Sequence, residues 1–167
     1  MSAKFLYRAL GVRGYELVGE DYPPGLGLFR LEQPRSSLSC PNCGSKAVTS
    51  RGGEVRQFRT VPLGGRQLYL QLRVPRVECG RCQLQRQVKI GFASPRLSYT
   101  HSFERYALGL GRLMTIDDVA RHLGVGWDTI KEIQRRHLTA KYSKPRLKEV
   151  RLLGIDEVYQ GPRGGFL

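Results

Sequence analysis

Residues 40–44 read Cys-Pro-Asn-Cys-Gly and residues 79–82 read Cys-Gly-Arg-Cys, and these two stretches hold all four cysteines of the 167-residue chain. Two thiolates separated by two residues can bind one metal ion from a tight turn, and two such turns supply the tetrahedral Cys₄ shell that structural zinc prefers. We expect Gly44 and Gly80 to supply the backbone freedom that these turns need. The predicted zinc ligands are Cys40, Cys43, Cys79 and Cys82.

Other interpretations of the cysteines fit the sequence less well. Disulfides are disfavoured in the cytosol, where we expect this chain to reside. A redox Cys-x-x-Cys motif begins a helix in a thioredoxin-like βαβ pattern, which is absent here, and unpaired core cysteines would not form two matched turns. Because four protein ligands leave no open position, the metal would be structural, and residues 37–92 would depend on it for folding.

The residues between the two cysteine pairs predict a β-hairpin. Residues 67–74 alternate between apolar and polar side chains, which is the period of a strand with one buried face. Residues 55–62 form the expected partner strand, residues 63–65 the turn, and residues 85–90 a last strand. Since zinc ribbons commonly have about 15–20 residues between their pairs, the hairpin accounts for the longer separation.

Another hairpin is expected ahead of the ribbon. Residues 10–18 and 26–33 are short runs that contain apolar residues, and residues 19–25 have the composition of a loop. The first 17 residues lack a signal-peptide core. No apolar run approaches the ~20 residues that a membrane span requires, so an integral membrane protein is excluded.

From about residue 100 the apolar period changes from 2 to 3.6, which predicts helices. Phe103, Tyr106, Ala107, Leu110 and Met114 lie on one apolar helical face. The first helix is expected over residues 102–113. In residues 115–138, Thr115 can cap a second helix and Gly124 can end it in a left-handed conformation. A third helix starts at about Trp127. This arrangement predicts a helix-turn-helix, although an ordinary helical hairpin has similar features.

The last helix of such a motif lies in the major groove of DNA. Its expected base contacts are Trp127, Asp128, Lys131, Glu132 and Arg135, and the expected phosphate contacts are Arg121, Arg136 and Lys141. Trp127 could equally be a core residue. His122 and His137 are expected on the surface, since the cysteines already complete a metal shell.

The net charge favours a polyanionic partner. The chain has 28 Lys+Arg against 14 Asp+Glu, a formal net charge of +14. Residues 37–92 carry ten basic and two acidic side chains, and residues 93–150 carry eleven and six. Because the excess coincides with the two modules, double-stranded DNA is favoured over a merely basic, solvated surface.

The order of these elements resembles the N-terminal part of bacterial insertion-sequence transposases that carry a zinc finger, a helix-turn-helix and a DDE catalytic domain. The segments behind the resemblance are residues 10–14, 40–44, 77–82, 115–133 and 153–157. The resemblance implies binding to the terminal inverted repeats of the element, in the cytoplasm and in association with the nucleoid. It also implies DNA transposition and recombination by divalent metal held by two Asp and one Glu on an RNase H-like sheet.

Asp156 matches the first of those three carboxylates, as the catalytic residue of the family's pattern. The chain ends at Leu167, before a second Asp or the Glu. We therefore expect a truncated transposase that retains DNA binding and does not cleave strands alone. Mg²⁺ is expected only for a full-length catalytic domain, and the expected protein partners are a second copy of the chain or a full-length transposase.

The expected fold class is α+β. Residues 1–36 would form the N-terminal hairpin, 37–93 the zinc ribbon, 98–141 the three-helix domain and 146–167 the start of the RNase H-like domain. The alternative function is a stand-alone regulator that binds an operator or competes with an intact transposase. In a third interpretation, the basic ribbon binds structured RNA. This fits the charge but assigns no function to the helix-turn-helix.

Overall fold

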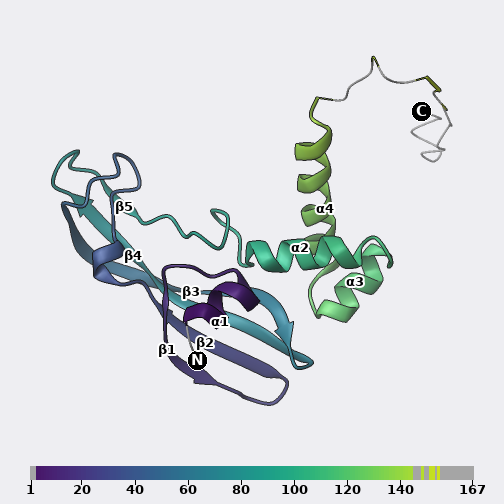
Figure 1. Ribbon diagram of the computed structural model, residues 1–167, viewed down its shortest axis with the longest axis horizontal. Coiled ribbons are helices and arrows are strands. Elements are labelled where there is room, and N and C mark those ends of the chain that lie inside the picture. Colours follow the sequence, from purple (N-terminus) through teal and green to yellow (C-terminus); the bar gives the residue numbers. More distant parts are fainter. Residues whose placement is uncertain (1–2, 145–147, 149–150, 153, 155–167) are drawn as a thin grey trace, which may run out of the picture. The chain divides into compact units, whose positions relative to one another are not determined.

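The computed structural model describes residues 3–144, 148, 151–152 and 154 (Figure 1). Its elements in chain order are α1 (Ala3–Leu10), β1 (Glu16–Asp21), β2 (Leu26–Glu32), the 3-10 turn η1 (Arg35–Ser37), β3 (Val48–Leu63), β4 (Arg66–Cys79), β5 (Gln85–Gln87), α2 (His101–Leu110), α3 (Ile116–Leu123) and α4 (Trp127–Tyr142). Residues 1–134 form one unit and residues 135–167 a second, with the boundary inside α4. The expected α+β class is confirmed.

The ribbon hairpin is longer than the sequence predicts. β3 and β4 pair antiparallel from Val48 opposite Cys79 to Leu63 opposite Arg66. Gly64 and Gly65 form the two-residue turn, with φ values of +57° and +74°. Because both turn residues need a positive φ in such a hairpin, the glycines determine where the chain reverses.

The N-terminal hairpin and the ribbon share one sheet. The strand order is β1-β2-β4-β3, with β5 on β4, and β2 runs parallel to β4. Phe29 pairs with Leu70 and Leu31 with Leu72, so the apolar faces of both hairpins are continuous. The boundary that we expected between residues 36 and 37 therefore falls between strands of a single sheet.

The alternation in β4 buries one face, as predicted. Leu68, Leu70, Leu72 and Val74 are all buried, together with Phe58 on β3. The ring of Phe92, from the segment after β5, packs edge-on against Phe58 at a centroid distance of 5.3 Å. The sheet thus has a continuous apolar core on this face.

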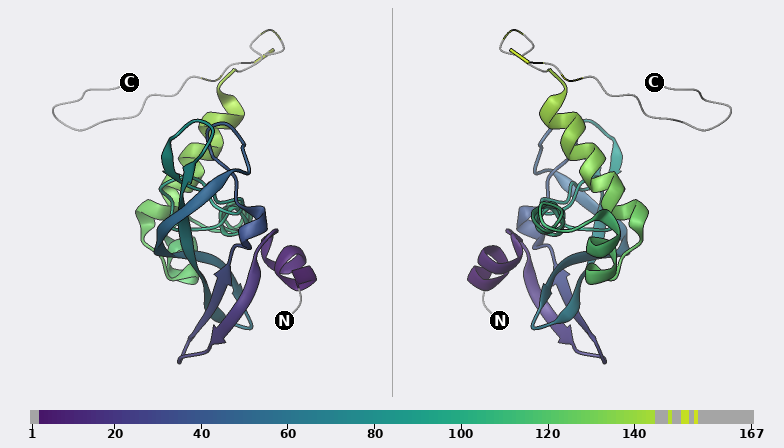
Figure 2. Two further views of the ribbon diagram at one scale, coloured as in Figure 1. Left: turned by 90° about the vertical axis from the view of Figure 1, so that its left-hand side faces the viewer. Right: turned by 90° about the vertical axis from the view of Figure 1, so that its right-hand side faces the viewer.

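α1 is an element that the sequence interpretation misses. α1 lies beside the sheet (Figures 1 and 2). Its Leu6 and Leu10, four residues apart on one helical face, are buried in the same core as the sheet. The strand expected over residues 10–18 begins only at Glu16. Gly11 and Gly14, with φ values of +70° and +82°, separate the helix from this strand.

The helices form a second core that contains Phe103, Ala107, Val119, Ile130 and Ile133. α2 is shorter than the helix expected over residues 102–113, since it ends at Leu110. Tyr106, expected on the buried face, is 37% exposed. Among the residues that the structure describes, no helix has the length and apolar character needed to cross a membrane.

Candidate metal centre and nucleic-acid interface

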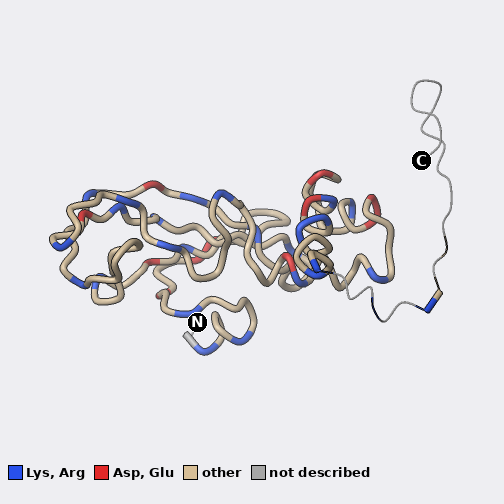
Figure 3. The backbone as a smooth tube through the Cα atoms, turned by 90° about the horizontal axis from the view of Figure 1, so that it is seen from above, with Lys and Arg blue, Asp and Glu red and all other residues tan. Residues whose placement is uncertain are grey.

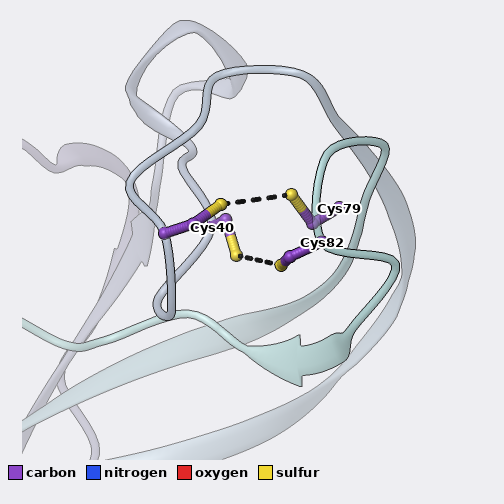
Figure 4. A group of neighbouring side chains, drawn as sticks. Cys40, Cys79 and Cys82 are labelled. Carbon is purple, nitrogen blue, oxygen red and sulfur yellow. Dashed lines mark hydrogen bonds between the residues drawn. The ribbon is translucent and has the colours of Figure 1, made fainter.

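The four predicted cysteines come together at one end of the ribbon (Figure 4). The Sγ atoms of Cys40 and Cys82 lie 3.6 Å apart, as do those of Cys43 and Cys79. All four sulfurs lie within 4.8 Å of one another, and none is in a disulfide. Since a zinc ion with bonds of about 2.3 Å in a tetrahedron separates its sulfurs by roughly 3.8 Å, this donor set fits Zn²⁺.

Two turns with matching hydrogen bonds hold the sulfurs. In the first turn, the N–H of Asn42 points to Cys40 Sγ at 3.4 Å and the N–H of Gly44 donates to Cys40 O at 2.9 Å. In the second, the N–H of Arg81 points to Cys79 Sγ at 3.4 Å and the N–H of Gln83 donates to Cys79 O at 2.8 Å. The geometry of the two turns is the same although their sequences differ.

The residue after the second cysteine of each turn is left-handed. Gly44 has φ +72°, as expected, whereas Gln83 has φ +55° at the equivalent position. The expectation for Gly80 is wrong: Gly80 has no positive φ, and a Cβ there would meet Ala47 O at an ordinary 3.5 Å. A side chain in the left-handed region costs about 1–2 kcal/mol, so the second turn is strained at Gln83.

This difference between the turns predicts opposite effects of exchanging their residues. We expect Gln83→Gly to raise the free energy of unfolding of the zinc-loaded chain by up to about 1 kcal/mol and Gly44→Gln to lower it by about 1–2 kcal/mol. Gly80→Ala is the matched control, with a change within about 0.5 kcal/mol. Urea unfolding at saturating zinc measures all three, and equal effects at Gly44 and Gly80 would contradict the assignment.

The environment of the sulfurs favours a bound cation. The backbone N–H of Cys82 lowers the pKa of the Cys79 thiol to about 6, and the backbone N–H of Cys43 lowers the pKa of the Cys40 thiol. Although the backbone N–H of Ser45 stabilises the Cys43 thiolate, burial and the neighbouring thiols raise its pKa to about 11. Four adjacent thiolates repel one another, and a divalent metal removes this repulsion.

The helix-turn-helix has the expected caps. Thr115 Oγ1 accepts a hydrogen bond from the N–H of Asp118 at 3.2 Å, and Gly124 is left-handed with φ 62° and ψ 45°. The N–H of Val125 then donates to Ala120 O at 3.0 Å. These contacts complete the sharp turn from α3 into α4.

The start of α4 presents several of the predicted DNA contacts. Trp127 is 44% exposed, so it is not a core residue, and Asp128 and Lys131 are exposed on the same helix. Lys131 Nζ lies 4.7 Å from the centroid of the Trp127 ring. Glu132 is half-buried beside them.

The other predicted contacts have different surroundings. Arg121 is ion-paired with Asp117 at 2.9 Å and with Asp118 at 2.7 Å. The Thr115 hydroxyl, and after it the Arg121 charge, lower the pKa of Asp118. Both carboxylates would compete with a DNA phosphate for the exposed Arg121 guanidinium.

In the second unit, Arg135 and Lys141 are exposed and Arg136 is half-buried. His122 and His137 are exposed. Asp156 lies outside the described residues. Lys and Arg occur along both the sheet and the helices (Figure 3).

The sequence interpretation misses two residues with structural roles at these sites. Gln83 carries the left-handed position of the second cysteine turn. Arg59, on β3, is buried and donates to a carbonyl of α3. Neither has a local sequence signal, because glycine would be expected at the first position and an exposed polar residue at the second.

Comparison with known proteins identifies both modules. Residues 37–82 match the family described as the zinc-finger of transposase IS204/IS1001/IS1096/IS1165. Residues 88–138 match the helix-turn-helix domain of transposase family ISL3. No solved structure matches the chain.

Curated relatives extend the similarity to most of the chain. The transposase for insertion sequence element IS1001 of Bordetella parapertussis is 24% identical over 153 residues, which is 88% of this chain and 37% of that protein. The transposase for insertion sequence element IS1557 of Mycobacterium tuberculosis is 25% identical over 151 residues, or 88% of this chain and 34% of that protein. The chain thus spans about a third of the length of these relatives.

Proposed function

Because the chain carries the zinc ribbon and helix-turn-helix of an N-terminal insertion-sequence transposase region, we propose that it recognises double-stranded DNA at the ends of its element. The observation that carries the proposal is the exposed start of α4, where Trp127, Asp128 and Lys131 follow the left-handed turn at Gly124. The second helix of a helix-turn-helix reads bases through such N-terminal positions.

The proposed contacts divide by chemistry. Trp127, Asp128, Lys131, Glu132 and Arg135 would meet base edges, and Arg136 and Lys141 would meet phosphates, with a smaller contribution from Arg121. Cys40, Cys43, Cys79 and Cys82 would hold a structural zinc ion. With no open ligand position, this ion would supply folding energy and no Lewis-acid chemistry.

We also propose for this protein a catalytic reaction, a protein partner and a location, which are typical of insertion-sequence transposases. Strand transfer would need Mg²⁺ held by Asp156 together with two more carboxylates. A second copy of the chain or a longer transposase is the proposed protein partner. Binding to DNA would place the protein with the nucleoid in the cytoplasm.

A pair of lysine variants tests whether α4 contacts bases. We expect Lys131→Ala to weaken binding to a duplex selected by the chain from a random library by about 1–3 kcal/mol, with a much smaller effect on a scrambled duplex. Lys141→Ala, the matched control on the same helix, should weaken both duplexes alike and reduce the salt slope by about 0.9. Fluorescence anisotropy at several salt concentrations measures both quantities.

The same titration can contradict the proposal. If the chain selects no sequence from the library, or if Lys131→Ala weakens selected and scrambled duplexes equally, α4 does not read bases at this position. A selected duplex that is bound more than about tenfold more tightly than the scrambled one supports sequence recognition.

A further inference from the structure

An arginine is buried where β3 meets the helix-turn-helix. Arg59 is 5% exposed, and its guanidinium donates to backbone carbonyl oxygens from two parts of the chain. Nη1 donates to Leu68 O on β4 at 3.2 Å, and Nη2 donates to Leu123 O at 2.9 Å. Burying a charged group is costly unless its polar atoms find hydrogen-bond partners. The hydrogen bonds to the β4 and α3 carbonyl oxygens offset part of this cost.

Arg59 contacts the C-terminal end of α3, which is the first helix of the helix-turn-helix. Leu123 is the last residue of α3, directly before the left-handed Gly124. Carbonyl groups at a helix C-terminus lack intrahelical partners and carry partial negative charge. Arg59 therefore supplies, from the sheet, a cation that caps the helix at the turn into α4.

Backbone and hydroxyl groups at the same place hold α2. The N–H of Arg59 donates to Ser98 O at 2.8 Å, and the N–H of Thr100 donates to Arg59 O at 2.9 Å. Thr100 Oγ1 donates to Thr60 Oγ1 at 3.2 Å and also caps the start of α2. Residues 59 and 60 thus contact the beginning of α2, while the Arg59 side chain contacts the end of α3.

Aromatic rings from both modules enclose the guanidinium. Its carbon lies 5.2 Å from the ring centroid of Tyr69 on β4 and 5.6 Å from that of Phe103 on α2. Gln67 on β4 also lies so close to Gly124 that a Cβ at this glycine would collide with its side-chain amide. The sheet therefore approaches the turn through Gln67 as well as through Arg59.

We propose that Arg59 is a positioning residue that fixes the helix-turn-helix on the zinc-stabilised sheet, so that the two modules bind one DNA duplex as a rigid body. The DNA part of this role rests on the function proposed above. Two modules in a fixed arrangement pay less conformational entropy on binding than two modules joined by a flexible linker. A bidentate guanidinium suits the role because it donates in two directions at once, which an ammonium on a single stem does less well.

The test uses the full, zinc-loaded chain and two independent measurements. ¹⁵N relaxation reports whether amides of β3–β4 and of α2–α3 tumble with one correlation time. Anisotropy measures binding to the selected duplex and to a scrambled one. The variants are Arg59→Gln and Arg59→Lys, with Arg73→Gln as control, since Arg73 is an exposed arginine of the same sheet that donates to Gly53 O.

We expect the wild type and Arg73→Gln to show one correlation time. Arg59→Gln should give a shorter correlation time for α2–α3 than for the sheet, with both modules still folded by their chemical shifts. Its binding to the selected duplex should weaken by about tenfold, and binding to the scrambled duplex by much less. Arg59→Lys should lie between the wild type and Arg59→Gln.

Several outcomes would overturn the role. A single correlation time in Arg59→Gln would show that other contacts hold the modules together, and equal loss of binding to both duplexes would show that Arg59 does not position a reader. If Arg59→Gln does not fold, the relaxation of Arg59→Lys tests the proposal instead. A single correlation time for the sheet and α2–α3 in Arg59→Lys would then reject the proposal. Failure of the wild type to bind DNA would refute the proposed function. The relaxation measurements would still test whether Arg59 fixes the helix-turn-helix on the sheet.

Discussion

Removing zinc should unfold the ribbon and abolish sequence-specific DNA binding. Structural zinc sites contribute an apparent free energy of about 10–16 kcal/mol at neutral pH, which is as large as the whole stability of a typical small domain. Here the metal would join the turn before β3 to the turn after β4, and without it four thiols within 4.8 Å of one another have no cation between them. Chelation should therefore melt the region from about residue 37 to 92.

Circular dichroism during titration with a chelator measures this loss, and readdition of zinc should restore the signal. Cys79→Ser should behave like the chelated protein, because it removes one of the four ligands. Ser45→Ala is a suitable control, since it changes the first turn without removing a sulfur. A fully folded ribbon in metal-free protein, with four freely reactive thiols, would refute the zinc site.

The second large effect is expected at the centre of the helical core. Phe103 is completely buried and contacts both the ring of Tyr99 and the guanidinium of Arg59. Phe103→Ala should lower the free energy of unfolding by about 3–5 kcal/mol, because it removes buried apolar surface and leaves a cavity. Specific DNA binding should fall with it, since α2 supports the turn that leads into α4.

Tyr106→Ala provides a matched control on the same helix. The sequence pattern predicts both aromatic residues on the buried face, but Tyr106 is 37% exposed. We expect its substitution to cost about 1 kcal/mol or less. Thermal unfolding of the two zinc-loaded variants measures the difference, and a larger loss from Tyr106→Ala would contradict the buried position of Phe103 and the exposed position of Tyr106 on α2.

Local signals were strong where short spacing carries the chemistry. The two Cys-x-x-Cys pairs predict a common cluster, and the structure brings the four sulfurs together. The period of two in residues 67–74 correctly predicts the buried face of β4, and Thr115 and Gly124 correctly predict both ends of α3. Within each cysteine pair, strand or helix, the signal comes from residues only a few positions apart.

Features that depend on distant residues were missed or displaced. α1 is stabilised by burying Leu6 and Leu10 against the sheet, a contact that its own eight residues do not reveal. The parallel pairing of β2 with β4 joins strands separated by the whole first cysteine turn and β3. Tyr106 lies at the edge of the expected apolar stripe, and packing of neighbouring helices decides that it stays exposed.

The amino-acid sequence by itself determined the four-cysteine cluster, the buried face of β4 and the caps of the helix-turn-helix, because these follow from local spacing, side-chain period and backbone preference. Only the tertiary structure decided that the two hairpins form one sheet, that Gln83 takes the left-handed position, and that Arg59 meets the end of α3. The physical reason is that these outcomes depend on which surfaces pack together. A strand edge and a buried guanidinium are each stabilised by partners far away in the chain, and the turn at Gln83 brings its cysteines against those of the distant first turn.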